Sequence, residues 1–301
     1  MRKIFIRLKQ KPLSILLLLI PCALLAEWLH WGTVWVFVFS AIGVIPLAGL
    51  IGEATEVLAV YTGPKIGGLL NATLGNAAEL IITLVAIRAG LLELVKASIT
   101  GSILGNLLLV MGLSMVVGGI CNGIQTFDKQ QASNHAILLL LSVVALLIPS
   151  LFSHTIGPSN SPEVEALSLG VAGVMIVLYI FGLIYSLKTN KSPIVVEPSE
   201  IAHYAPHWTK KKSFIVLALA TLGVVILSEL LVGAVEEVIV SLGISEFFLG
   251  IILIPIVGNV AEHLVAVTTA ARNQMDLSVE ISISSSLQIA LFVAPLLVFV
   301  S

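Results

Sequence analysis

The sequence predicts an all-α integral membrane protein built from two related halves, and two observations support this prediction. Hydrophobic residues make up 58% of the 301 residues and charged residues only 11%, whereas soluble domains carry about 25% charge. Mean hydropathy is +1.10. In addition, the motif Gly75-Asn76-Ala77-Ala78-Glu79 lies in an apolar run and recurs as Gly258-Asn259-Val260-Ala261-Glu262. A carboxylate at membrane depth costs about 2.5–3.5 kcal/mol on insertion scales, so a duplicated one indicates a shared functional site.

Nine apolar segments are predicted to cross the membrane as helices, and most of them reach the ~20 residues that a span needs. Strands are not expected, because the apolar runs are continuous and do not alternate with polar residues. The predicted spans are Leu13–His30, Thr33–Thr62, Gly67–Ala89, Leu91–Gly119, Ala132–Phe152, Val164–Lys188, Ser213–Leu242, Phe247–Arg272 and Leu277–Ser301.

The basic residues support this set of spans. With the N-terminus in the cytoplasm, cytoplasmic ends hold 13 of the 15 Lys and Arg residues, and only Arg88 and Lys96 fall on the other side. This bias is what the positive-inside rule predicts. The basic start, Met1 to Lys11, followed by Leu13–Leu29, also fits a signal peptide. We favour a retained first helix, because the apolar run is long for a signal sequence.

Composition also disfavours several other classes. The net charge of −2 gives no electrostatic argument for nucleic-acid binding. Cys22 and Cys121 lie in apolar context without a CxxC pattern, so neither a disulfide framework nor a zinc site is indicated.

The predicted organisation has four parts. Residues 1–31 form an N-terminal extra helix, 32–188 a first half of five helices, 189–212 a cytoplasmic linker, and 213–301 a second half of three helices. The linker carries Glu197, Glu200, His203 and His207, which could form a regulatory cation site, although a solvated loop is the favoured interpretation.

The repeat extends beyond the Gly-Asn-x-Ala-Glu motif. Glu56 precedes Gly63 by seven residues, and Glu236 precedes Gly243 by seven. By the count of spans, the helices of the two motifs run in opposite directions. This is the inverted-repeat architecture of secondary transporters, whose binding sites lie near the bilayer midplane.

Polar side chains around the two motifs are predicted to form one site of oxygen ligands. On a helix, positions i and i+3 or i+4 share a face. In each motif the Asn precedes the Glu by three residues. Ser102 precedes Asn106 by four residues, and Ser284 precedes Gln288 by four, so each pair shares a helix face. The predicted ligands are Glu79, Glu262, Asn76, Asn259, Asn106, Gln288, Ser102 and Ser284. Packing between helices is the alternative role for the small polar residues.

An all-oxygen shell suits a hard cation such as Ca²⁺, which takes about 6–8 oxygen ligands. Two carboxylates neutralise one divalent cation. Without the cation they would repel each other at low dielectric, so each would tend to take up a proton. Holding either one Ca²⁺ or two protons is the physical basis of antiport. Glu56, Glu236 and His263 are weaker candidates for a proton path or gate.

At these residues the sequence resembles the calcium/proton exchanger (CAX) family of the cation/calcium antiporter superfamily. The resemblance covers nearly the whole chain from about residue 33 and rests on two segments, Gly75–Val110 and Gly258–Pro295. It implies an inverted-repeat antiporter fold and a Ca²⁺ site shared by Glu79 and Glu262. It also implies proton-coupled Ca²⁺ export by sliding of the helices at Thr33–Thr62 and Ser213–Leu242. Ca²⁺ and protons would be substrates and the bilayer a partner, with no cofactor; a homo-oligomer is left open.

The sequence departs from the family pattern in two ways. The family has eleven helices, and this sequence shows nine, so we expect the last two helices of the second repeat to be missing. Ser284-Ser285-Ser286 also stands where a glycine-containing version is expected. Three alternatives remain: Na⁺-coupled cation exchange, an intramembrane metal-dependent enzyme using Glu262 and His263, and a passive channel. We expect a transporter rather than an enzyme, in a bacterial inner membrane with a cytoplasmic N-terminus.

Overall fold

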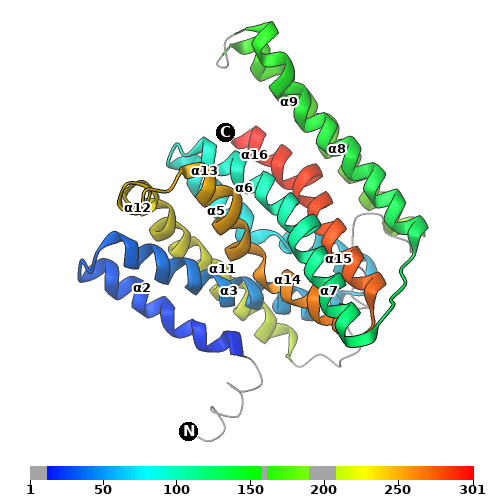
Figure 1. The fold of residues 1–301 in the computed structure, drawn as a ribbon, viewed down its shortest axis with the longest axis horizontal. Helices are drawn as coiled ribbons and strands as arrows, with labels where there is room; N and C mark the ends of the chain where they lie inside the picture. Colours follow the sequence, from blue (N-terminus) through cyan, green and yellow to red (C-terminus); the bar gives the residue numbers. More distant parts are fainter. Residues whose placement is uncertain (1–11, 158–160, 190–207) are drawn as a thin grey trace, which may run out of the picture.

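The computed structural model describes residues 12–157, 161–189 and 208–301, and within these ranges it contains helices and short connections without strands (Figure 1). The predicted all-α membrane class is therefore confirmed. Of the helices in the described ranges, seven are long and apolar enough to cross a membrane. The residues of the suggested regulatory cation site in the linker lie outside the described ranges; they are Glu197, Glu200, His203 and His207.

The first part of the described chain begins with a short apolar helix and continues through five further spans, one of which is interrupted. Its elements are η1 (Pro12–Leu18), α2 (Leu19–Trp28), α3 (Thr33–Thr62), α4 (Pro64–Leu74), α5 (Ala77–Arg88), α6 (Leu92–Leu104), η2 (Gly105–Val110), α7 (Met111–Asn122), α8 (Lys129–Ile156) and α9 (Pro162–Thr189). Here α6, η2 and α7 form one continuous helical span.

The second part of the chain has three spans, whose motifs match those of the α3, α4–α5 and α6–α7 spans of the first part. Its elements are α11 (Lys210–Gly233), α12 (Val235–Leu242), α13 (Glu246–Phe248), η3 (Leu249–Leu253), α14 (Ile254–Ala271), α15 (Met275–Gln288), η4 (Ile289–Val293) and α16 (Ala294–Val300). The segments η2, η3 and η4 are π-helical turns within longer helices. Such turns are frequent at functional sites; η2 contains the predicted site residue Asn106, and η4 directly follows Gln288.

Two predicted spans are interrupted. The span at 67–89 is divided into α4 and α5 by a turn at Gly75 and Asn76, and the span at 213–242 is divided into α11 and α12 at Ala234. A break within a span is tolerated where other helices or a cavity surround it. Both interruptions lie next to short polar motifs. A hydropathy pattern alone does not reveal them, because the flanking residues are apolar on both sides.

The helices α3 and α11 cross and pack closely against each other. A Cβ added to Gly43 would lie 2.9 Å from Leu227 Cδ1, and a Cβ added to Gly223 would lie 2.9 Å from Leu47 Cδ1. Each helix therefore accepts a leucine of the other at a glycine. Because Gly43 precedes Leu47 by the same four residues as Gly223 precedes Leu227, the crossing is itself a repeat feature.

The helices that carry the repeated motifs lie beside this crossing. Helix α14 packs against α3, α5, α7 and α15, while α5 packs against α11. The α15–α16 span is the most deeply buried of the seven, whereas α8 and α9 are largely exposed. In Figure 1 α8 and α9 form a hairpin along one side, in contact with α15 and α16.

Candidate functional site

Glu79 lies in the first turn of α5 and is 3% exposed. Its Oε1 accepts two hydrogen bonds, from the Ser102 hydroxyl of α6 and from the Asn259 amide of α14. Its Oε2 is buried and has no hydrogen-bond partner among the described residues. The carboxylate of the first motif is thus held by one side chain of its own half and one of the other half.

Glu262 on α14 is held in a related way. Its Oε2 accepts a hydrogen bond of 2.7 Å from the Ser285 hydroxyl on α15. Ser285 in turn accepts one of 3.0 Å from Asn106 Nδ2, at the start of η2 in the first half. Asn106 Oδ1 lies 3.0 Å from His263 Nε2. Contacts between the halves therefore support both carboxylates.

The glycines of the two motifs bring the carboxylates together. A Cβ added to Gly258 would lie 2.7 Å from Glu79 Cγ, and one added to Gly75 would lie 3.5 Å from Glu262 Oε1. Each glutamate lies against the glycine of the opposite motif, so the two helices approach at a point where neither has a side chain.

The amide and hydroxyl groups around this pair supply further oxygen atoms. Asn76 Nδ2 donates a hydrogen bond of 2.7 Å to Gln288 Oε1, so these amides also join the two halves. The buried Asn76 Oδ1 and Ser284 Oγ have no hydrogen-bond partner among the described residues. Together with Glu79 Oε2 they are three buried oxygens whose desolvation a cation could offset.

A cavity of about 200 Å³ reaches this cluster from one side. Glu262, Ser284, Ser285 and Gln288 line it, whereas Glu79 does not. Residues 48–56 of α3 form another part of its wall, including Glu56 and also Glu53. Sequence reasoning missed Glu53. The signal was available, because Glu53 precedes Glu56 by three residues on the same helix and so shares its face.

The structure corrects one pairing of the predicted residues. Ser284 was expected to be the counterpart of Ser102, but Ser285 makes the equivalent hydrogen bond. Ser102 follows Glu79 by 23 residues and Ser285 follows Glu262 by 23. Aligning the segment by its Ser-to-amide spacing shifted the pairing by one residue, which on a helix is a rotation of about 100°.

Glu236 is not brought into this cluster. It lies exposed on α12, beside Glu237, whose carboxylate accepts a hydrogen bond from the Thr33 hydroxyl. Thr33 begins α3, whereas Glu56 lies near the opposite end of that helix. The two glutamates that the repeat relates are thus at different ends of the α3–α11 pair, and only Glu56 lines the cavity.

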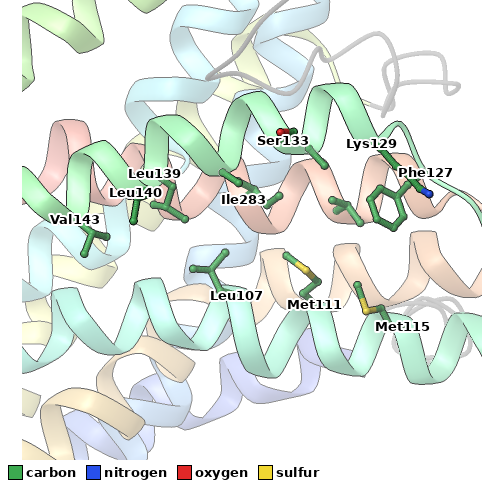
Figure 2. Close-up of a pocket in the computed structure, with 13 residues that line it drawn as sticks. Leu107, Met111, Met115, Phe127, Lys129, Ser133, Leu139, Leu140, Val143 and Ile283 are labelled. Atoms are coloured by element: carbon green, nitrogen blue, oxygen red, sulfur yellow. The ribbon is translucent and has the colours of Figure 1, made fainter.

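A second cavity is larger, at about 620 Å³, but its chemistry is different (Figure 2). It lies between α8, α15 and the η2–α7 segment, and apart from Lys129 and Ser133 its wall is apolar. Its members include Leu107, Met111 and Met115. None of its lining residues belongs to the predicted ligand set, so the smaller polar cavity is the candidate ion site.

Within the described ranges no group of three or more His, Cys, Asp or Glu residues is arranged to hold a metal ion. The cluster around Glu79 and Glu262 combines these two carboxylates with amides and hydroxyls, and Glu53 and Glu56 lie further along the cavity wall. This composition suits an ion that is bound and released, with oxygen ligands preferred by hard cations.

Comparisons with known proteins agree with this architecture. A family model described as sodium/calcium exchanger protein matches residues 32–188 and 212–301. A protein of Aphanothece halophytica named Ca(2+)/H(+) antiporter is 43% identical over 296 residues, covering 94% of this chain and 79% of that protein. The Bacillus subtilis Ca(2+)/H(+) antiporter ChaA is 44% identical over 287 residues, covering 94% and 80%.

Solved structures show the same fold. The structure of native YfkE matches with a TM-score of 0.80 and 40% identity, covering 95% of this chain and 80% of that one. The crystal structure of the H+/Ca2+ exchanger CAX matches with a TM-score of 0.72 over 95% and 72%, and at 17% identity it supports the fold alone. The family model matches both halves of this chain. The relatives that are more than 40% identical align with it over most of their length. This chain therefore belongs to the sodium/calcium exchanger protein family.

Proposed function

We propose that this chain is a secondary transporter that exchanges Ca²⁺ for H⁺ across a membrane and extrudes Ca²⁺ from the cytoplasm. The observation that carries the proposal is the reciprocal placement of Glu79 and Glu262, each packed against the glycine of the opposite motif. The names of the Aphanothece and Bacillus relatives support the same ions.

In this proposal, Glu79 and Glu262 bind the divalent cation directly, and oxygens of the surrounding amides and hydroxyls complete its shell. The proposed ligands besides the two glutamates are Asn76, Asn259, Asn106, Gln288, Ser102 and Ser284. When the cation leaves, two facing carboxylates in a water-poor site repel each other, and proton uptake removes that repulsion. One Ca²⁺ and protons therefore compete for the same oxygens.

We place the N-terminus in the cytoplasm, and we propose a bacterial inner membrane as the location. The excess of basic residues at the ends assigned to the cytoplasm supports this orientation. With it, the end of α3 that carries Glu53 and Glu56 faces the cytoplasm, and the cavity beside Glu262 leads toward that side. Burial of Glu79 away from the cavity fits closure on the opposite side.

We also propose the division into an N-terminal helix at 1–31, a first half at 32–188, a linker at 189–212 and a second half at 213–301. The equal spacing of Ser102 and Ser285 from their glutamates supports the correspondence between the halves. The α3–α11 crossing, with its exchanged leucines, supports a two-fold relation between them.

The test is ⁴⁵Ca²⁺ flux into proteoliposomes under an imposed pH gradient. The unchanged chain is expected to accumulate Ca²⁺, and Glu79→Gln or Glu262→Gln is expected to abolish uptake while the protein remains folded in detergent. Glu163→Gln is the matched control, because Glu163 is an exposed carboxylate at the start of α9. Uptake by Glu79→Gln at the rate of the unchanged chain would contradict the proposal.

Na⁺-coupled cation exchange is the second candidate, because the matching family model is described as sodium/calcium exchanger. The same vesicles separate the two. A pH gradient without Na⁺ is expected to drive Ca²⁺ uptake, whereas uptake that requires a Na⁺ gradient would establish the alternative.

A further inference from the structure

A chain of side-chain hydrogen bonds connects the ring of His263 to the carboxylate of its sequence neighbour Glu262. It runs from His263 Nε2 to Asn106 Oδ1 at 3.0 Å, from Asn106 Nδ2 to Ser285 Oγ at 3.0 Å, and from Ser285 Oγ to Glu262 Oε2 at 2.7 Å. Asn106 and Ser285 are 1% and 4% exposed. The chain therefore runs through the protein interior and ends on one of the two carboxylates.

The directions of these bonds follow from the last one. A serine hydroxyl has one hydrogen, and here it is donated to the Glu262 carboxylate. Ser285 Oγ can then only accept, so the Asn106 group facing it must be the amide nitrogen. Asn106 Oδ1 consequently faces His263, and because a carbonyl oxygen accepts only, His263 Nε2 carries the hydrogen.

The other half lacks this chain. Leu80 follows Glu79 as His263 follows Glu262, and Ile289 follows Ser285 by the four residues that separate Asn106 from Ser102. Glu79 instead receives its second hydrogen bond from Asn259, at the same oxygen as that of Ser102. The two glutamates are thus equivalent in the repeat but oriented by different groups.

We propose that His263 is a positioning residue for Glu262, acting through Asn106 and Ser285. The inference rests on the proposed function, because the affected property is Ca²⁺ binding. The role of His263 is to donate a hydrogen bond and to fix the Asn106 amide, and His263 does not need to carry a proton. Without that donor, the amide can rotate and Ser285 no longer has a fixed direction of donation.

The variants that test this are His263→Leu and His263→Gln. Leucine is the residue that the other half carries at this position, so it fits the helix but donates nothing. Glutamine places an amide N–H near the position of Nε2 and does not titrate. Leu264→Ala is the control, because Leu264 is the next residue of α14 and is 43% exposed.

Two measurements are made on each variant: equilibrium ⁴⁵Ca²⁺ binding to the purified protein, and KM and kcat for pH-driven uptake in proteoliposomes. Loss of one hydrogen bond predicts about a 3- to 10-fold weaker Ca²⁺ affinity and a similar rise in KM for His263→Leu, with kcat changed less than KM. His263→Gln is expected to restore both, with the Ca²⁺-to-H⁺ ratio unchanged, and Leu264→Ala to match the unchanged chain.

Three results would overturn the inference. They are unchanged Ca²⁺ affinity in His263→Leu, failure of His263→Gln to restore affinity, and loss of proton coupling in His263→Gln, which would assign the imidazole a proton-carrying role. Failure of the proposed function is distinguishable, because it would remove pH-driven uptake from the unchanged chain. In that case equilibrium ⁴⁵Ca²⁺ binding still tests the role of His263. If the unchanged chain binds no Ca²⁺, the inference is overturned as well.

Discussion

Replacing Gly258 by alanine tests directly whether the close approach of the two motifs forms the ion site. The added Cβ would lie 2.7 Å from Glu79 Cγ and 3.7 Å from its Cδ. Real Cβ atoms do not approach other atoms that closely, so the Glu79 side chain or the helix must move. Overpacking of this kind costs about 1–3 kcal/mol.

A displacement of Glu79 is expected to appear as weaker ion binding. The carboxylate would lose the geometry of its bonds from Ser102 and Asn259, both of which end on Oε1. If the whole cost falls on the ion-bound state, 1–3 kcal/mol corresponds to about a 5- to 150-fold rise in KM, since each 1.4 kcal/mol is a factor of ten. The assay is Ca²⁺-dependent initial uptake in proteoliposomes under a fixed pH gradient.

Gly112→Ala is the matched control. Gly112 lies in α7, and a Cβ there would meet no atom within 4 Å. Alanine is the better helix former by about 0.5–1 kcal/mol, so this variant is expected to keep its KM and to unfold at an equal or higher temperature. A KM for Gly258→Ala equal to that of Gly112→Ala would refute the argument that the motif glycines bring the carboxylates together.

Three further predictions concern the serines and the helix crossing. Ser285→Ala removes a hydrogen bond to a carboxylate and is expected to raise KM for Ca²⁺ by about 10- to 100-fold; an effect smaller than that of Ser284→Ala would contradict the corrected pairing. Gly43→Ala is expected to destabilise the protein by about 1–3 kcal/mol, seen as a lower unfolding temperature in detergent. Leu227→Ala removes the opposing methyl groups and is expected to recover part of that loss in the double variant, and strictly additive effects would show that the two residues do not interact.

The fold class and most of the spans could be predicted because apolar length is a strong signal in membrane proteins. The bounds of α3 agree with the predicted Thr33–Thr62. The interruption at Ala234 was not predicted, because a break changes hydrogen bonding without changing hydropathy. The lateral position of the α8–α9 hairpin was also beyond reach, since both helices have the apolar composition of a central span.

The candidate site was accessible from sequence for a different reason, namely duplication. A buried acid that occurs once has many explanations, whereas the same acid in two inverted copies of one motif indicates a shared position. The ligand partners were harder to assign, because Ser284, Ser285 and Ser286 are consecutive and only the helix rotation decides which one faces Glu262. Glu53 was missed because its half-repeat counterpart is not acidic, so the repeat gave no second copy to support it.

The differences between the halves explain why two equivalent glutamates have different environments. In the second half, α14 runs without interruption through Gly258 and Asn259, whereas the first half has a turn at Gly75 and Asn76 between α4 and α5. Glu262 therefore lies in the middle of a continuous helix and borders the cavity, while Glu79 lies in the first turn of a helix and is buried. If the repeat exchanges these roles during transport, the opposite conformation must enclose Glu262 and open a path to Glu79, with the α3–α11 pair moving relative to both. A cysteine at Gly49, which lines the present cavity, should then lose accessibility to a water-soluble thiol reagent when Ca²⁺ favours the other conformation, and unchanged labelling would argue against that exchange.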